Sequence, residues 1–250
     1  MGVNSLHWYY APSLGNEGDQ VALEGEEWHH CHHVMRLVPG DQVVLCDGKG
    51  SCMKGTIRSA TKKEGGIEFT EDLSGHFHST RIYKLKVAMA PTRNIDRTEF
   101  AVEKLVELGV DEICFLQCHH SERTHLRIDR MEKILIAAAK QSRKTLFPVL
   151  QNLMSPAHYV DQKKKDNPGI RILGCHLDPD SKSISENYLP GHDVVVLIGP
   201  EGDFSNEELE MLKQKNVQFV HLGPYRLRVE TAAITACANI HFINEMKLTL

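Results

Sequence analysis

The sequence predicts an α/β protein in which a small N-terminal β-barrel or sandwich precedes a larger parallel α/β domain. Short segments of β-type pattern fill the first seventy-odd residues and surround one short helix. After about residue 80, continuous apolar runs alternate with segments of helical spacing, as in a domain built on a parallel sheet. Gly75 and several serine and histidine residues lie between the two patterns. We therefore expect a first domain at 1–74, a linker at 75–79 and a second domain at 80–250.

The N-terminal segments read as strands because apolar and polar residues alternate in them or because turn residues bound them. Asp47-Gly48-Lys49-Gly50 is a hairpin signal between two such segments, and Gly65-Gly66 precedes the last one. Residues 26–35 are typical of a short helix that ends before Pro39-Gly40. The predicted strands are residues 21–23, 41–46, 51–59 and 67–70.

The C-terminal segments alternate between strand and helix. Runs such as Val194–Ile198 are short and continuously apolar, which favours strands buried on both faces of a parallel sheet. Gly109 follows the first predicted helix as a C-cap, and Ser205 with Glu208 has the capping-box pattern at a later helix. The predicted strands are residues 82–89, 113–116, 170–175, 194–198 and 219–222, and the predicted helices are residues 95–108, 128–140, 205–213 and 229–242.

Composition excludes several classes of protein. With 41% hydrophobic and 25% charged residues among 250, the chain supports a packed core and is not disordered throughout. Its longest apolar runs are far too short to span a bilayer, and residues 1–8 lack the pattern of a secretory signal. The seven cysteines are scattered without a Cys-x-x-Cys pair, which favours reduced thiols over a disulfide framework. We therefore expect a cytoplasmic protein.

The net charge of −4 conceals an uneven distribution. Residues 1–74 carry 6 Lys and Arg against 11 Asp and Glu, residues 75–165 carry 16 against 10, and residues 166–250 carry 7 against 12. The basic middle of the chain is compatible with an anionic partner, because local potential rather than net charge steers association. A solvated basic surface without a partner is the alternative.

The segment His29-His30-Cys31-His32-His33 has metal-ligand residue types but not metal-ligand spacing. On a helix only pairs such as His29 and His33 share a face, and no third ligand follows at a suitable spacing. Structural zinc sites usually show paired ligand spacings. We expect no metal.

The strongest local signal is the apolar run Val194–Ile198, which leads into Gly199-Pro200-Glu201-Gly202 and then into the helix that Ser205 caps. Ligands in open α/β sheets bind at the carboxyl ends of strands, where loops and helix N-termini offer free backbone groups. Gly199 and Gly202 lack a Cβ, so a ligand can approach their backbone closely. An ordinary strand-to-helix turn fits the spacing equally well, and the pattern is not the Gly-x-Gly-x-x-Gly of dinucleotide folds.

A second segment has the same organisation. The predicted strand 219–222 ends in Gly223-Pro224, and Arg226, Arg228 and Glu230 follow before the last helix. Charged groups in such a turn are unfavourable when they are buried without partners. Either an Arg228–Glu230 ion pair fixes the loop, or the turn holds an anionic substrate and moves a proton.

Together these segments resemble the two C-terminal motifs of the SPOUT-class 16S rRNA (uracil-N3)-methyltransferase family. The matching residues are 197–202 with Phe204, Ser205 and Glu208, and Leu222-Gly223 with Leu227, Arg228, Glu230, Thr231 and Ala232. Further support comes from residues 103–110, 140–142 and 33–37, from Gly40-Asp41 and from Asp47-Gly48. The resemblance covers nearly the whole chain.

The resemblance implies a PUA-like barrel at 1–74 for RNA recognition and a SPOUT α/β domain at 80–250 whose C-terminal part forms a trefoil knot. It also implies a homodimer without a metal or a membrane partner, S-adenosylmethionine (SAM) as methyl donor, and methylation of a uridine N3 in 16S rRNA of the small ribosomal subunit. The residues that it assigns to the cofactor are Leu173, Gly174, Cys175, Leu197, Ile198, Gly199, Gly202, Leu222, Gly223, Leu227 and Arg228.

Methylation at N3 requires the uracil to lose a proton, so a base or a cation that stabilises the uracil anion lowers the barrier. On this reading Arg228 is the catalytic cation and Glu230 orients it. N3 lies on the Watson–Crick edge, so the target base has to be unpaired or extruded. Arg36, Arg93 and Arg143 are the RNA-binding candidates.

The sequence departs from the family pattern at three positions: Val229 stands where threonine is usual, Asp203 where glycine is frequent, and Lys140 where glutamate is frequent. A cofactor site made of backbone groups tolerates all three, although Val229 argues against a mechanism that needs a hydroxyl there. Two other functions stay open. One is a ribose 2′-O-methyltransferase of the same fold, and the other is a non-catalytic RNA-binding assembly factor.

Overall fold

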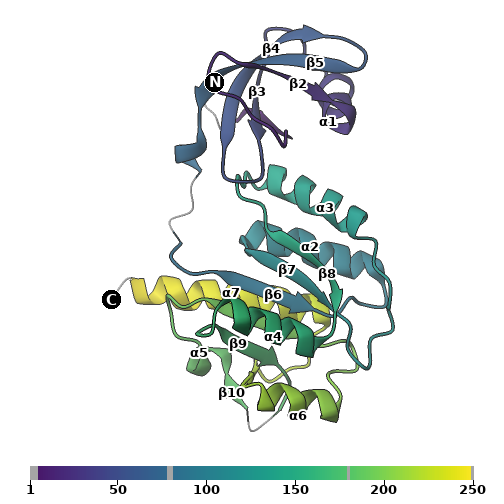
Figure 1. Cartoon of the computed structure of the whole chain (residues 1–250), viewed down its shortest axis with the longest axis vertical. Helices are drawn as coiled ribbons and strands as arrows, with labels where there is room; N and C mark the ends of the chain where they lie inside the picture. The colour runs from purple at the N-terminus through teal and green to yellow at the C-terminus, as the bar shows by residue number, and fades with distance from the viewer. Residues whose placement is uncertain (1–4, 78–80, 179–180, 249–250) are drawn as a thin grey trace. The chain divides into compact units, whose positions relative to one another are not determined.

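The computed structural model describes residues 5–77, 81–178 and 181–248. Contacts divide the chain into two compact units, which are Met1–Thr80 with Ile136–Phe147, and Arg81–Leu135 with Pro148–Leu250 (Figure 1). We call them the N-terminal unit and the C-terminal unit. The returning segment Ile136–Phe147 does not belong to the predicted first domain, which follows the chain without interruption. The predicted linker at 75–79 lies partly outside the described residues.

The N-terminal unit is built on a five-stranded sheet in the order β1-β3-β4-β5-β2. Its strands are β1 (His7–Tyr10), β2 (Gln20–Glu24), β3 (Gln42–Cys46), β4 (Cys52–Ala60) and β5 (Glu64–Asp72). β1 pairs with β3 in parallel and the other pairs are antiparallel. The hairpin between β3 and β4 is stabilised by Asp47, whose Oδ1 accepts the N–H groups of Lys49 and Ser51. The sheet is a half-barrel that runs from β1 to β2, so a β architecture is confirmed for this part of the chain, although β1 was not predicted.

The predicted helix of the N-terminal unit is present in two parts, α1 (Gly25–His29) and the π-helix η2 (His30–Val34). Trp28 on α1 is buried against the sheet, and its Nε1 donates a hydrogen bond to the carbonyl oxygen of Thr61 at 2.9 Å. A Cβ on Gly65 would lie only 2.1 Å from the Trp28 ring, so glycine in β5 makes room for the indole. The predicted helix therefore packs on the sheet through Trp28, which belongs to one of two hydrophobic clusters among the described residues of this unit.

The returning segment completes the N-terminal unit through polar contacts. It contains the second half of α3 (Ile128–Gln141), where Lys140 Nζ lies 2.5 Å from Glu27 Oε1. The other carboxylate oxygen of Glu27 accepts the N–H of Tyr10. The Phe147 N–H donates to the carbonyl of Gly48 at the β3–β4 turn. Lys140, one of the departures from the family pattern, thus forms an ion pair inside this unit.

The C-terminal unit contains a seven-stranded sheet in the order β10-β12-β9-β11-β6-β7-β8, and all of its strand pairs are parallel. The strands are β6 (Leu85–Met89), β7 (Glu112–Leu116), β8 (Val149–Met154), β9 (Arg171–Cys175), β10 (Lys182–Ser183), β11 (Val194–Ile198) and β12 (Gln218–His221). The predicted parallel sheet is confirmed. β8 and β10 were not predicted.

Helices connect these strands: α2 (Ile95–Leu108), α3, α4 (Pro156–Asp166), α5 (Ile184–Asn187), α6 (Asn206–Gln214) and α7 (Val229–Leu248). Gly109 ends α2 in the left-handed conformation, and Ser205 with Glu208 forms the predicted capping box of α6. The unpredicted α4 carries Lys163, whose Nζ lies 2.7 Å from the buried Glu112 Oε2. No helix within the described ranges is long and apolar enough to cross a membrane.

Candidate active site

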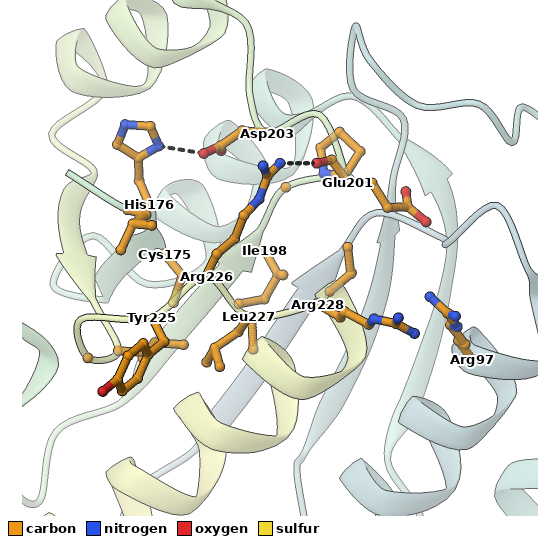
Figure 2. Close-up of a pocket in the computed structure, with 17 residues that line it drawn as sticks. Arg97, Cys175, His176, Ile198, Glu201, Asp203, Tyr225, Arg226, Leu227 and Arg228 are labelled. Atoms are coloured by element: carbon orange, nitrogen blue, oxygen red, sulfur yellow. Dashed lines mark hydrogen bonds and ion pairs between the residues drawn. The ribbon is translucent and has the colours of Figure 1, made fainter.

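A cavity of about 610 Å³ opens at the carboxyl ends of β9, β11 and β12 (Figure 2). In the sheet Ile198 lies opposite Cys175, and Cys175 lies opposite Val220, so the loops that follow these strands emerge at one edge. Further lining residues come from the first turns of α2 and α7. The complete lining is Arg97, residues 175–177, 198–201, Asp203, Leu222, Gly223, residues 225–229 and Ala232.

Most of the residues assigned to the cofactor line this one cavity. They are Cys175, Ile198, Gly199, Leu222, Gly223, Leu227 and Arg228. The turns that begin at Gly199 and at Gly223 therefore belong to the same site, although more than twenty residues separate them in the sequence. This is the arrangement that the cofactor hypothesis requires.

Four assigned residues do not line the cavity. Leu173 and Leu197 are fully buried inside β9 and β11. A Cβ on Gly174 would lie 2.7 Å from the Phe219 ring, so this glycine allows close packing of β12. Gly202 is exposed, and a Cβ there would lie 3.1 Å from Cβ of His120, so this glycine lies close to His120 rather than at the cavity.

The two site glycines are required for different reasons. A Cβ on Gly199 would lie 3.2 Å from both the ring and the backbone nitrogen of Phe204, because the turn folds back on itself. Gly223 has φ +130°, a backbone conformation that residues with a Cβ rarely adopt, and open space lies where its Cβ would be. Both positions thus present main chain, rather than a side chain, to the cavity.

Asp203 connects three strand-end loops. Its carboxylate oxygen Oδ2 accepts a hydrogen bond from Nδ1 of His176 at 2.7 Å (Figure 2). Its carbonyl oxygen accepts one from Nδ1 of His120 at 3.0 Å. Its own backbone is left-handed, with φ 64°. Neither histidine was predicted as a site residue. Asp203 therefore occupies a conformation that glycine adopts readily, and its side chain adds a hydrogen bond that glycine cannot make.

The loops after β11 and β12 are joined through Glu201. The Arg226 guanidinium donates to the Glu201 carbonyl oxygen at 3.0 Å, as Figure 2 shows. The Glu201 carboxylate accepts the backbone N–H of Arg93 at 2.9 Å, which brings in the loop after β6. Arg226 thus helps to position the loop that contains Glu201.

The charges of the site are arranged differently from the prediction. Glu230 was expected to orient Arg228, but its ion pair is with Arg97, whose Nε lies 3.9 Å from Glu230 Oε1. The Arg228 side chain has no hydrogen-bond or ion-pair partner among the described residues, and it lines the cavity. The Oε2 atom of Glu230 is buried and likewise has no hydrogen-bond partner within the described ranges. Figure 2 shows Arg97 and Arg228 on the same side of the cavity.

Arg97 is the functional candidate that the sequence interpretation missed. Its position in the first turn of α2, the helix that follows the predicted strand 82–89, was the available signal. Which arginine pairs with Glu230 depends on how α2 packs against α7, and the sequence alone does not determine that packing.

The RNA-binding candidates lie in different units. Arg36 and Arg143 belong to the N-terminal unit, where each has a left-handed backbone and Arg36 is exposed. Arg93 is exposed in the C-terminal unit, and its Nε lies 3.2 Å from Glu122 Oε2. Each arginine is thus presented by a turn or loop of its own unit.

The cysteine at the cavity is a buried residue of its wall. Burial raises the pKa of the Cys175 thiol to about 12, so this side chain is a neutral, apolar part of the wall near pH 7. Within the described part of the chain, no group of three or more His, Cys, Asp or Glu side chains could hold a metal ion. His29 and His33 lie near one another, with ring centroids 5.0 Å apart, as the helical spacing suggests.

Comparison with known proteins agrees with this arrangement. Residues 79–241 match the family model described as RNA methyltransferase domain, and residues 23–68 match the one described as RNA methyltransferase PUA domain. The chain is 28% identical over 240 residues to ribosomal RNA small subunit methyltransferase E of Rickettsia conorii, covering 94% of each protein.

Two solved structures are similar to the chain over nearly its whole length. A probable rRNA-methyltransferase from Porphyromonas gingivalis has a TM-score of 0.86 and 34% identity, with 97% of this chain and 100% of that one covered. A methyltransferase from Legionella pneumophila, solved in complex with the bound cofactor SAM, has a TM-score of 0.83 and 26% identity, with 95% and 97% covered. The chain therefore belongs to the ribosomal RNA small subunit methyltransferase E family, in which a PUA domain accompanies the RNA methyltransferase domain.

Proposed function

We propose that this protein transfers the methyl group of SAM to N3 of a uridine in 16S rRNA of the small ribosomal subunit, in the cytoplasm. The observation that carries the proposal is that the Gly199 and Gly223 turns line one cavity together with Arg97 and Arg228. Family membership supports RNA methylation, and the relative from Legionella pneumophila was solved with SAM. The choice of uracil N3 rests on the sequence motifs described above.

The cavity suits a nucleoside-sized cofactor. Its volume of about 610 Å³ lies within the range of small-molecule sites, which are mostly apolar with a few convergent polar groups. Ile198, Leu222 and Leu227 supply apolar walls, and the backbone at Gly199 and Gly223 is free of side chains. When bound, SAM supplies a methyl group on a positively charged sulfur. The neutral Cys175 thiol in the wall offers no competing nucleophile.

The arginines of the cavity are assigned to the RNA substrate. For methylation, the uracil N3 gives up its proton to solvent and forms a bond to the methyl carbon as the bond between that carbon and sulfur breaks, which releases S-adenosylhomocysteine. Negative charge develops on the ring as the proton leaves. Arg228, free of protein partners among the described residues, is the cation placed to stabilise that charge. Glu230 acts as a positioning residue through Arg97, since its ion pair is formed there. Alignment of N3 with the methyl carbon supplies much of the remaining acceleration.

The proposal includes two architectural features. One is a trefoil knot: β12 lies on the far side of β9 from β11, yet α7, which follows β12, packs against β11, β6 and α2. The chain thus returns past β9, which is the path that a threaded C-terminal segment takes. The other is a homodimer. Phe242 and Met246 on α7 are 64% and 60% exposed, which supports a partner surface on that helix.

The N-terminal unit is proposed as the RNA-recognition domain, with Arg36 and Arg143 as phosphate contacts. The match of residues 23–68 to a PUA model supports this assignment. Positive side chains that contact phosphates contribute affinity without sequence preference.

The test combines binding with nucleoside analysis. We expect the purified protein to bind SAM in calorimetry and to convert one uridine of unmodified small-subunit RNA into N3-methyluridine, identified by mass spectrometry of the digested RNA. Methylation on the ribose would contradict the N3 assignment and favour the 2′-O-methyltransferase alternative. RNA binding without SAM binding would identify a non-catalytic assembly factor instead.

A further inference from the structure

A second cavity of about 290 Å³ lies in the C-terminal unit, and the reaction proposed above does not use it. Arg93, which follows β6, lines it together with Glu122, Arg123, Thr124 and His125, which follow β7. β6 and β7 are parallel neighbours, and β6 also pairs with β11, so both cavities open at the carboxyl edge of the same sheet.

One segment of the chain contributes to both cavities. Residues 92–97 place Arg93 in the second cavity and Arg97 in the first. The backbone N–H of Arg93 donates to Glu201, which lines the first cavity. The two cavities are therefore linked by one short segment of the chain.

The two arginines of the second cavity differ in how the protein holds their side chains. The Arg123 guanidinium is fixed by two carbonyl oxygens, since Nη2 donates to Arg93 at 2.9 Å and Nε donates to Thr92 at 3.3 Å. The Arg93 side chain is 80% exposed and pairs with Glu122, which is 57% exposed. An ion pair as exposed as this is weak and is readily exchanged for another anion.

The remaining lining side chains are available to a ligand. Thr124 and His125 have no hydrogen-bond or ion-pair partner within the described ranges, and both line the cavity. A hydroxyl, an imidazole and two guanidinium groups make a donor set suited to a phosphate, because the planar guanidinium matches phosphate oxygens in pairs. Glu122 is the one carboxylate among these lining residues, and its negative charge repels an anion in the cavity.

We propose that this second cavity binds a phosphodiester group of the RNA strand whose target base enters the first cavity, and that this phosphate displaces Glu122 from Arg93. The inference rests on the proposed function, because it takes RNA as the substrate. It assigns opposite effects to two neighbouring residues. Arg93 strengthens RNA binding, whereas Glu122 weakens it by occupying Arg93 and repelling the phosphate.

The experiment measures the affinity of a small-subunit rRNA fragment for three variants over a range of salt concentrations. Arg93→Gln is expected to weaken binding and to reduce the slope of log K against log salt by about 1. Glu122→Gln is expected to tighten binding by about two- to five-fold, the amount that releasing an exposed ion pair provides. Arg127→Gln is the control, because Arg127 is exposed, pairs with Asp129 and does not line the cavity.

Two further measurements separate this inference from the proposed function. The affinity for SAM is expected to stay the same in all variants, and methylation is expected to change in KM for RNA rather than in kcat. If the wild-type protein methylates RNA while Arg93→Gln and Glu122→Gln leave RNA affinity unchanged or shift it in the same direction, the phosphate site is wrong and the proposed function stands. A wild-type protein that neither binds SAM nor methylates RNA overturns both.

A third arm uses inorganic phosphate as the probe. Phosphate is expected to compete with the RNA fragment in the wild-type protein and to compete less in Arg93→Gln. Phosphate binding that depends on Arg93, with RNA affinity that does not, would identify a site for free phosphate and overturn the RNA assignment.

Discussion

The Nε atom of Arg97 lies 3.9 Å from Oε1 of Glu230, so the first turn of α7 holds a side chain of α2 at the wall of the cavity. Both residues belong to helices that begin at the carboxyl edge of the sheet. Because Glu230 pairs with Arg97, the Arg228 side chain has no protein partner among the described residues. The Oε2 atom of Glu230 is buried and accepts no hydrogen bond from any described residue. A buried carboxylate is stabilised by its cationic partner, which ties the position of Arg97 to the presence of Glu230.

Removal of the free cation is expected to affect the chemical step. Arg228→Ala should lower kcat for methyl transfer by about a hundredfold, as loss of one group that stabilises developing charge does in other enzymes. SAM affinity, measured by calorimetry, should change much less, because apolar walls and backbone dominate that part of the cavity. Arg228→Lys should restore part of the rate. An unchanged rate in Arg228→Ala would rule out the catalytic assignment.

Neutralising the buried carboxylate tests the Arg97 contact. Glu230→Gln keeps the side-chain volume but removes the charge, and it should lower methyl transfer by roughly tenfold through displacement of Arg97. Arg97→Ala combined with Glu230→Gln should cost no more than the larger single effect, because both act through one contact. Glu210→Gln is the control, since Glu210 pairs with Lys213 on the exposed face of α6. Additive losses in kcat would show that the two residues act independently.

Two glycine substitutions separate backbone strain from ligand binding. Gly223 and Gly40 have φ +130° and +101°, and open space lies where a Cβ would be at either position. Alanine at either position should lower the free energy of unfolding by about 1–3 kcal/mol, measured by urea denaturation. Only Gly223→Ala should also weaken SAM binding, because Gly40 lies in the N-terminal unit. Equal SAM affinity in both variants would remove Gly223 from the cofactor site.

The buried thiol in the cavity wall gives a stability that depends on pH. Burial raises the pKa of the Cys175 thiol to about 12, from the value of about 9 that an exposed cysteine has. Between these values the unfolded chain releases the thiol proton and the folded chain keeps it, so the free energy of unfolding falls as pH rises above about 9. Cys175→Ala should therefore reduce the slope of stability against pH between 9 and 11, measured by denaturation at each pH. An unaltered slope would contradict the assignment.

Loss of one partner of the buried ion pair between β7 and α4 is expected to destabilise the protein. Lys163 and Glu112 are 3% and 6% exposed, with 2.7 Å between Nζ and Oε2, and the Tyr159 hydroxyl donates to the other carboxylate oxygen. Lys163→Met should lower the free energy of unfolding by about 3–5 kcal/mol, because it leaves a buried carboxylate unpaired. Adding Glu112→Gln should recover much of this loss. A double variant no more stable than Lys163→Met would show that the charge is not the cause.

Local patterns in the sequence indicated the two turns that line the cavity. The apolar run before Gly199 and the turn at Gly223-Pro224 are recognisable because strand burial and turn chemistry depend on adjacent residues. The capping box at Ser205 is local in the same way, and it is confirmed. The structure adds that these turns line one cavity.

Features that depend on distant contacts were not predictable. β8 has no continuous apolar run and is half exposed, and β10 has two residues, so neither gives a periodic signal. Arg97 rather than Arg228 pairs with Glu230 because of how two helices pack. Gly202 lies close to His120, and the sequence gives no signal of this contact because the two residues are more than eighty positions apart. The sequence interpretation also had no signal for the return of Ile136–Phe147 to the N-terminal unit.

That return has a consequence for biosynthesis. Glu27 meets Lys140, and the β3–β4 turn meets Phe147, only after the ribosome has made another hundred residues or so beyond the hairpin. Until then Glu27 lacks its lysine partner, and the carbonyl oxygen of Gly48 lacks the hydrogen bond from Phe147. A chain that stops before residue 136 leaves the sheet in that condition, so an expression fragment meant to isolate the PUA region has to carry the later segment as well.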